Sequence, residues 1–258
     1  AREPGTKGLV TATRGNHGQS LALAARSVGL PIRIVVPEGN SVEKNAAMRA
    51  LGATVIECGK DFDEARTHAA VLAHTYKLHL VPAFHPDLIR GVATYALELL
   101  EAVEELDTVY VPIGMGSGIC GLIQARDLLG LKTEIVGVVS AHADAYAQSV
   151  EQGRVVCTES AHTFADGLAC RQPLPEALEI IAKGAARVIR VSDQQIAHAI
   201  RVYHETTHNT AEGAGAAALA GLISERSRQK GRRVALILSG ANIDRLLYAA
   251  ILANSADA

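Results

Sequence analysis

The sequence contains no tryptophan, only 3% aromatic residues and no long apolar run. Scarce aromatic residues argue against a surface on which nucleic-acid bases stack. The near balance of 25 basic and 27 acidic residues argues against a polyanionic partner. A membrane span needs about 18 apolar residues in a row, and no charged-then-apolar leader opens the chain. We therefore expect no nucleic acid and no membrane as partner, a cytoplasmic location, and a small molecule as substrate.

Several signatures of other chemistries are also missing. The four cysteines form no CxxC pair, which indicates thiols of a reducing compartment rather than a disulfide framework. The ten histidines form no HExxH or other ligand spacing. No GxSxG is present either. A metal hydrolase and a serine hydrolase are therefore both excluded.

What the sequence does contain is a regular alternation of β-rich and amphipathic segments within 258 residues, 48% of them hydrophobic. The β-rich runs are continuously apolar, as in strands that are covered on both faces. Alternation of this kind predicts an α/β fold with right-handed crossovers and mostly parallel sheets. The expected strands are residues 8–13, 32–37, 53–59, 78–83, 108–114, 134–139, 186–192 and 233–240, and the helical windows are 41–51, 62–76, 88–104, 193–206 and 212–229.

The pattern is interrupted by "AFHPD" near residues 84–87. Two open sheets flanked by helices fit the spacing better than one sheet of eight strands. We expect a small domain over residues 8–87 and a large domain over residues 88–258. In such sheets ligands bind beyond the carboxyl ends of the strands, so the loops after "GLVTAT", "TVYVPI" and "VALIL" are the candidate site.

The first of these loops places Arg14, Gly15, Asn16 and His17 between a strand and an alanine-rich helix. A plain connection needs only a turn residue and a helix cap. This one carries three side chains able to hold a polar ligand.

The second loop is "GMGSGICG", residues 114–121, which leads into a helix. Glycines expose backbone N–H groups, and a helix start favours anions, so the loop predicts a phosphate site with the Ser117 hydroxyl as a further donor. The structural alternative is a tight strand–helix turn. The spacing is neither GxxxxGK[ST] nor GxGxxG, although a dinucleotide site stays open as a rival.

Three further positions have both a functional and a structural interpretation. Ser239 ends the last strand, where a serine commonly caps a helix, here one starting near Asn242. Glu212 precedes a small-residue helix, whose N-terminus favours an acid. Asp166 and Gly167 most simply form a turn.

Taken in order, "TRGNHGQ", "GMGSG", "FADGLA", "EGAGAAAL" and "LSGANID" resemble the serine/threonine dehydratase and serine racemase family, the fold-type-II pyridoxal-phosphate enzymes with a tryptophan-synthase-β-like fold. "VPEGNSVEKNAAMRALGA" and "HPDLIRGVATYALEL" support the resemblance, which covers about residues 8–251.

The resemblance implies roles for specific residues. Thr13, Asn16 and His17 match the loop that closes on the substrate α-carboxylate, and Asn16 matches an asparagine that also bonds the ring hydroxyl of the cofactor. Ser239 matches the residue facing the pyridine nitrogen, and Glu212 an acid near the ring. The loop that binds the phosphate of pyridoxal 5'-phosphate corresponds to Gly114, Met115, Gly116, Ser117 and Gly118.

The chain also departs from the family pattern. Arg14 stands where relatives have a small residue and racemases a serine, and a guanidinium is a poor proton donor, so racemisation is not expected. Arg14 becomes a further candidate for substrate binding. The acidic metal-site residues of some relatives are not evident around "SAHADAYAQ", so we expect no metal.

We call the loop that carries Asn16, residues 13–17, the asparagine loop. The Schiff-base lysine of the family lies some thirty residues before this loop, which places it upstream of Ala1. Lys44 corresponds to a position on a surface helix, and Lys7 and Lys60 do not fit. We expect this chain to be a segment of a longer protein that also supplies the start of the large domain. The alternative is a shortened homologue without that chemistry.

The implied function is a pyridoxal-phosphate-dependent ammonia-lyase (dehydratase) that converts threonine or serine to a 2-oxo acid and ammonia, as a homodimer or homotetramer. Two alternatives stay open. One is a dehydratase of 3-hydroxyaspartate or another β-substituted amino acid, and the other a non-catalytic relative that binds the cofactor or an amino acid.

Overall fold

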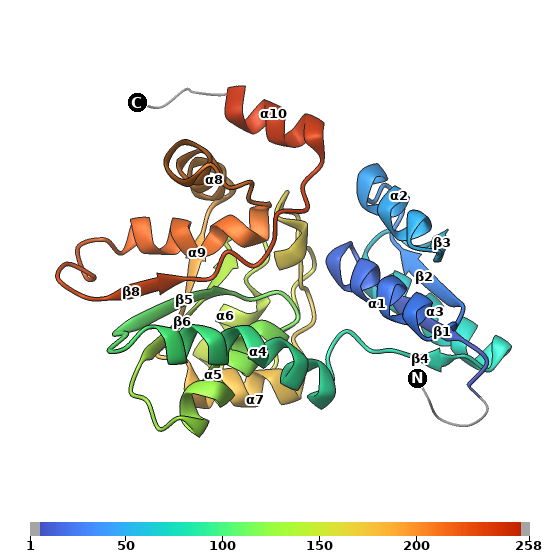
Figure 1. The fold of residues 1–258 in the computed structure, drawn as a ribbon, viewed down its shortest axis with the longest axis horizontal. Helices are drawn as coiled ribbons and strands as arrows, with labels where there is room; N and C mark the ends of the chain where they lie inside the picture. The colour runs from blue at the N-terminus through green and yellow to red at the C-terminus, as the bar shows by residue number, and fades with distance from the viewer. Residues whose placement is uncertain (1–5, 254–258) are drawn as a thin grey trace. The chain divides into compact units, whose positions relative to one another are not determined.

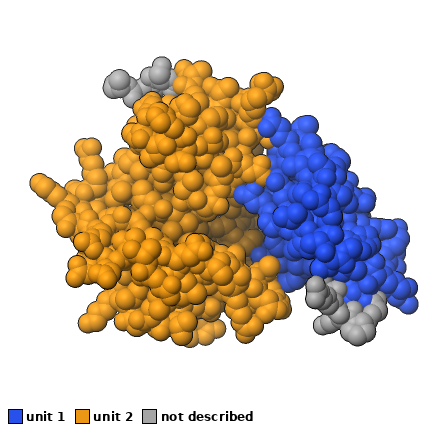
Figure 2. Space-filling view, in the orientation of Figure 1, with its two compact units in different colours: residues 1–83 blue, residues 84–258 orange. Residues whose placement is uncertain are grey.

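The computed structural model describes residues 6–253 and divides the chain into two compact units, Ala1–Ala83 and Phe84–Ala258 (Figure 2). We describe each unit by itself. The assignment of a substrate loop to residues 8–87 and a phosphate loop to residues 88–258 stays a prediction.

The first unit holds one parallel sheet of four strands in the order β3-β2-β1-β4. Buried apolar residues of the strands face both sides of this sheet. Ile34 and Met48 belong to the cluster under α1 and α2, and Val10 and Ala65 to the cluster under α3. The elements are β1 (Leu9–Ala12), α1 (Asn16–Ser27), β2 (Ile32–Val36), α2 (Val42–Ala50), β3 (Thr54–Glu57), α3 (Phe62–Tyr76) and β4 (His79–Leu80).

The second unit holds a parallel sheet in the order β7-β6-β5-β8, with helices on both faces (Figure 1). The elements are α4 (Pro86–Ala102), β5 (Thr108–Pro112), α5 (Ser117–Leu128), β6 (Glu134–Ser140), α6 (Ala145–Gln152), the 3-10 turn η1 (Asp166–Leu168), α7 (Pro175–Gly184), β7 (Arg187–Val191), α8 (Asp193–Thr207), α9 (Gly213–Ser224), β8 (Val234–Leu236) and α10 (Arg245–Ala253). Eight parallel strands in two sheets confirm the expected α/β fold.

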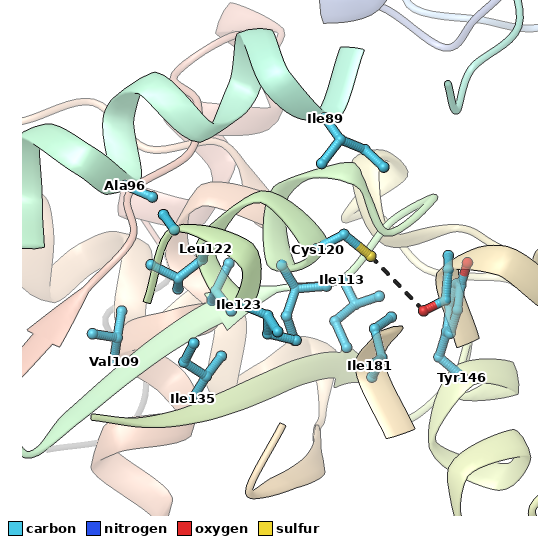
Figure 3. Packing of buried hydrophobic residues seen from close by; sticks show 14 of the residues in the cluster. Ile89, Ala96, Val109, Ile113, Cys120, Leu122, Ile123, Ile135, Tyr146 and Ile181 are labelled. Carbon is cyan, nitrogen blue, oxygen red and sulfur yellow. Dashed lines mark hydrogen bonds between the residues drawn. The ribbon is translucent and has the colours of Figure 1, made fainter. Parts of the chain in front are cut away.

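One face of this second sheet is closed by α4, α5 and α7. Figure 3 shows Ala96 of α4 above Leu122 of α5 and Ile89 of α4 above Cys120, with Val109 of the sheet beneath. Cys120 is fully buried in the same cluster, and burial raises the pKa of its thiol to about 12. Cys58, Cys120, Cys157 and Cys170 are all free.

Three boundaries differ from the sequence-based expectation. Helix α9 ends at Ser224, five residues before Gln229. Strand β8 is only three residues long, and the following helix begins at Arg245 rather than near Asn242. The apolar run outlasts β8 because Ile237 and Leu238 stay half-buried against the core of this unit after the last β5–β8 pair, at Leu236. Among residues 6–253, no helix combines the length and apolar character that a membrane crossing requires.

Each strand order contains a topological switch point. In the first sheet β1 lies between β2 and β4, and in the second β5 lies between β6 and β8. Connections leave in opposite directions from β1 and from β5, which opens a crevice at the carboxyl ends. The loops after β1, β5 and β8 therefore lie where an open α/β sheet binds ligands.

Candidate active site

The loop after β1 is shaped by Thr13, whose side chain is buried. Its Oγ1 accepts hydrogen bonds from the N–H groups of Gly15, at 3.0 Å, and Gly18, at 3.3 Å. Because Gly15 at the N-cap position of α1 has no side chain, Thr13 supplies the cap from two residues upstream. A direct contact of Thr13 with a substrate stays a prediction.

The glycine of this loop is required by a close approach. A Cβ atom at Gly15 would lie 2.6 Å from Cδ of Lys44 in α2. Lys44 itself is only 5% exposed, so its assignment to a surface position was wrong. The aliphatic part of a lysine is readily buried, and here it supports the backbone next to Arg14 and Asn16.

His17 is half-buried in the first turn of α1, and burial lowers the pKa of its imidazole. Its Nε2 lies 3.4 Å from Oγ1 of Thr11. The Thr11 hydroxyl donates its one hydrogen to the carbonyl of Val81, at 2.8 Å. The imidazole must therefore donate from Nε2, which leaves Nδ1 as an acceptor.

The other two polar side chains of this loop differ in exposure. Asn16, the first residue of α1, is exposed. Arg14 is half-buried, and its Nε is shielded from solvent and has no hydrogen-bond partner in the described part of the chain.

In the second unit, the glycine loop joins β5 to α5. Gly116 adopts φ +101°, a left-handed conformation that favours glycine, and is the N-cap of α5. No side chain of residues 6–253 caps this helix. A Cβ atom placed on Gly118 would meet nothing within 4 Å, so there is open space beside the first turn. Ser117 is the first residue of the helix.

Two tyrosines, the half-buried Tyr95 and the buried Tyr146, hold this loop. Tyr95 donates a hydrogen bond from Oη to the carbonyl of Gly118, at 3.0 Å, and Tyr146 donates to the carbonyl of Met115, at 2.9 Å. Burial raises the pKa of both phenols, so they stay protonated donors. Sequence analysis missed these tyrosines, because nothing local connects them with a loop that is 23 to 31 residues away.

The other loops of the second unit pack against the glycine loop and against one another. A Cβ atom on Gly114 would lie 2.2 Å from the carbonyl oxygen of Gly167, and one on Gly215 would lie 2.3 Å from that of Gly240. Side chains at these positions would force the loops apart. The structure thus brings the segments "GMGSG", "FADGLA", "EGAGAAAL" and "LSGANID" together.

Glu212 fastens two of these segments. It is 4% exposed, its N–H donates to the carbonyl of Gly240 at 3.0 Å, and its Oε2 accepts from the N–H of Asn242 at 3.1 Å. Ser239 is exposed and directly precedes this junction. Because α10 begins only at Arg245, Ser239 does not cap a helix, and the structural alternative is wrong.

No three His, Cys, Asp or Glu side chains gather as a metal site within residues 6–253. The predicted absence of a metal is not tested by this finding.

Comparison with known proteins places this arrangement in a family. A family described as "Pyridoxal-phosphate dependent enzyme" matches residues 1–240. The chain belongs to this family. It is 34% identical to the L-threonine ammonia-lyase of Thermotoga maritima over 95% of the chain, and spans 61% of that protein. It is 30% identical to the L-threo-3-hydroxyaspartate ammonia-lyase of Saccharomyces cerevisiae, over 99% of the chain and 78% of that protein.

Among solved structures, the processed form of threonine deaminase isoform 2 from Solanum lycopersicum matches with a TM-score of 0.91 and 30% identity, covering 99% of this chain and 76% of that one. The expected fold-type-II architecture is confirmed. The cofactor of the family is pyridoxal 5'-phosphate, and the second unit fits it. The uncapped start of α5 and the space beside Gly118 suit a phosphate.

Proposed function

We propose that the protein is a pyridoxal-phosphate-dependent ammonia-lyase that converts a β-hydroxy amino acid such as threonine or serine to a 2-oxo acid and ammonia. The meeting of four loops at the β5–β8 switch point carries this proposal. Supporting it, relatives along nearly the whole chain are named L-threonine ammonia-lyase. The chain spans 61% of each of these two, so the activity of the whole protein is inferred.

In this proposal the phosphate is held by backbone N–H groups from Gly114 to Gly118. The first N–H groups of a helix have no acceptor within it, and the macrodipole adds a partial positive charge. The Ser117 hydroxyl is a further donor. Tyr95 and Tyr146 keep the loop in this conformation by occupying its carbonyl oxygens.

In the second unit, the ring is held by Glu212 and Ser239. When bound, the cofactor withdraws electrons from the carbon that carries the substrate amine. Ser239 supplies a neutral hydroxyl, which forms a hydrogen bond to a ring nitrogen without protonating it. A carboxylate at that position would stabilise the protonated nitrogen instead. The residue at 239 therefore tunes how strongly the ring withdraws electrons.

The loop of the first unit that carries Thr13, Asn16 and His17 holds the substrate α-carboxylate. Nδ1 of His17 accepts a hydrogen bond, so it receives a donor of the substrate or the loop rather than the carboxylate itself. The carboxylate is left to N–H donors of the loop and to the Asn16 amide.

The decisive experiment uses the full-length gene product, because we place the lysine that holds the cofactor upstream of Ala1. The protein should show a visible absorption band that borohydride abolishes, and release ammonia and 2-oxo acid from threonine or serine. Peptide mapping should place the reduced cofactor upstream of Ala1. Labelling of Lys7, Lys44 or Lys60 would overturn this location. A bound cofactor without product release would indicate a non-catalytic relative.

Ser239 provides the matched pair of variants. Ser239→Ala should lose one hydrogen bond, about 1 kcal/mol. Ser239→Asp should alter the absorption spectrum and the balance between elimination and side reactions. Unchanged spectra and turnover in both variants would remove Ser239 from the site.

We further propose a cytoplasmic homodimer or homotetramer. The free cysteines support the reducing compartment. Light scattering of the purified full-length protein tests the assembly.

A further inference from the structure

The unpartnered guanidinium in the asparagine loop is the starting point. Arg14 forms no hydrogen bond and no ion pair with any of residues 6–253, and its Nε is shielded from solvent. Other half-buried arginines have partners, which for Arg33 is the ring of Tyr76 and for two others an acid. Arg126 lies 2.6 Å from Asp127, and Arg187 lies 2.5 Å from Glu225.

This state is unfavourable for an arginine. A guanidinium keeps its charge at any pH a protein meets. A shielded N–H without an acceptor loses its hydrogen bonds to water and gains none in return. An anion that brings two acceptor oxygens would satisfy Arg14, and a carboxylate matches the geometry of the guanidinium fork.

The backbone around Arg14 is held in place before any ligand arrives. On one side the Thr13 hydroxyl accepts from the N–H groups of Gly15 and Gly18. On the other side the Lys44 side chain packs against Gly15, and Lys44 is 5% exposed. A guanidinium on such a support loses little freedom when it binds, which favours affinity.

Arg14 also lies where a ligand is expected. It follows β1 at the β1–β4 switch point, next to Asn16 and His17. In the proposed function the Asn16 amide and the N–H groups of this loop bind the α-carboxylate that every amino acid carries. A second anionic group is then left for Arg14.

We propose that Arg14 binds a second carboxylate, on the side chain of the substrate, and so selects a β-hydroxy amino acid that is a dicarboxylate, such as 3-hydroxyaspartate. This inference rests on the proposed function for the reaction itself. The binding of a dicarboxylate by Arg14 can be measured separately.

The kinetic test compares L-threo-3-hydroxyaspartate, threonine and serine in the full-length holoenzyme. Arg14→Ala should lower kcat/KM for the dicarboxylate by about 30- to 1000-fold and change the other two by less than about 3-fold. Arg14→Lys keeps the charge without the fork and should retain part of the preference. Arg26→Ala, which changes an exposed arginine on α1, the helix that follows Arg14, is the matched control and should behave as the parent.

The binding test uses malonate, an unreactive dicarboxylate, with acetate as the monocarboxylate control. The parent should bind malonate more tightly than acetate, and Arg14→Ala should lose that difference. If no amino acid is converted while malonate binding still depends on Arg14, the proposed reaction fails and this inference stands. Circular dichroism of both Arg14 variants checks that they fold.

Three results would overturn the inference. One is an equal loss on all three substrates in Arg14→Ala, which would assign Arg14 to the α-carboxylate or to loop structure. Another is a parent enzyme that rejects 3-hydroxyaspartate while converting threonine or serine. The third is preference for O-phosphoserine over 3-hydroxyaspartate, which would replace the carboxylate by a phosphate.

Discussion

Residues in and next to the β1 loop show how the tautomer of a histidine depends on atoms of other strands. Thr11 of β1 gives its hydroxyl hydrogen to Val81, just beyond β4, and so requires a hydrogen on Nε2 of His17. The imidazole then differs at its two nitrogens, with Nε2 used by the protein and Nδ1 free to accept from a ligand.

The first prediction concerns this tautomer. Nitrogen-15 NMR of the parent at neutral pH should show a neutral His17 with its hydrogen on Nε2, and a titration midpoint below about 6.5. Thr11→Val, which keeps the shape of the side chain, should mix the two tautomers and cost about 1 kcal/mol or slightly more of unfolding free energy. A hydrogen found on Nδ1 of the parent would contradict the assignment.

The lowered pKa of His17 also gives stability a definite pH dependence. The unfolded chain takes up a proton near pH 6.5, whereas the folded imidazole resists it. The contribution of His17 is therefore present above that pH and is lost as the pH falls. In His17→Gln, the drop in unfolding free energy between about pH 7 and pH 5 should be smaller.

At the scale of elements, the start of α5 combines two glycines with opposite demands. Gly114 has a carbonyl oxygen 2.2 Å from the position of a Cβ atom, and Gly118 has open space there. The first glycine keeps two loops in contact, and the second leaves room beside the helix start.

The same chemical change at these two positions should therefore have different effects. Gly114→Ala should destabilise the cofactor-free protein by about 1–3 kcal/mol, because the loops must move apart. Gly118→Ala should leave its stability equal or slightly higher, since alanine favours a helix, yet weaken cofactor binding. Urea unfolding and cofactor titration distinguish them. Equal cofactor affinity in Gly118→Ala and the parent would argue against phosphate at α5.

Tyr146 connects α6 to this loop and to the start of α7. Its Oη donates to the Met115 carbonyl and accepts from the N–H of Leu174, at 3.3 Å. Tyr146→Phe should cost about 1–3 kcal/mol, because two buried backbone groups lose their partner, and should weaken cofactor binding. Tyr203→Phe on α8 is the matched control, because no described residue bonds that hydroxyl. Similar losses in both variants would mean that the hydroxyl of Tyr146 has no special role.

At the scale of the whole molecule, a buried polar network links distant parts of the second unit. Arg187 of β7 donates to Glu225 at the end of α9, and Tyr110 of β5 donates to the same carboxylate at 2.6 Å. Gln229 donates to Tyr110 at 2.8 Å. The network connects three elements across the sheet through groups that all have partners.

This network makes stability depend on acid. Burial alone would raise the pKa of Glu225, but hydrogen bonds from Arg187 and Tyr110 outweigh it and hold that pKa below its ordinary value. A lowered pKa in the folded state means that the contribution is present above about pH 4.3 and is lost as the pH falls further.

Glu225→Gln should therefore lower the unfolding free energy at neutral pH by about 1–3 kcal/mol, because Arg187 loses its 2.5 Å partner and keeps only the longer pair with Glu134, at 3.5 Å. The loss should shrink near pH 4. Glu179→Gln, which breaks an exposed pair with Lys183, should change stability little. Urea unfolding of the parent and both variants at neutral pH and near pH 4 measures these losses. A loss that is independent of pH would assign the effect to packing.

The sequence by itself determined the fold class, the two sheets and the loops of the candidate site. Continuous apolar runs predict covered parallel strands, and parallel strands bring their carboxyl ends, and hence the polar loops that follow them, to one edge. These features depend on periodicity and order along the chain, which the sequence states directly.

Only the tertiary structure decided which of these residues have structural partners. It buried Lys44 under Gly15, placed Tyr95 and Tyr146 on the glycine loop, and left the guanidinium of Arg14 without an acceptor among residues 6–253. Such contacts join residues far apart in sequence, and they depend on packing distances that no local pattern encodes. For that reason, the sequence could point to the loops of the candidate site, whereas the side chains that hold those loops in place could not be identified from it.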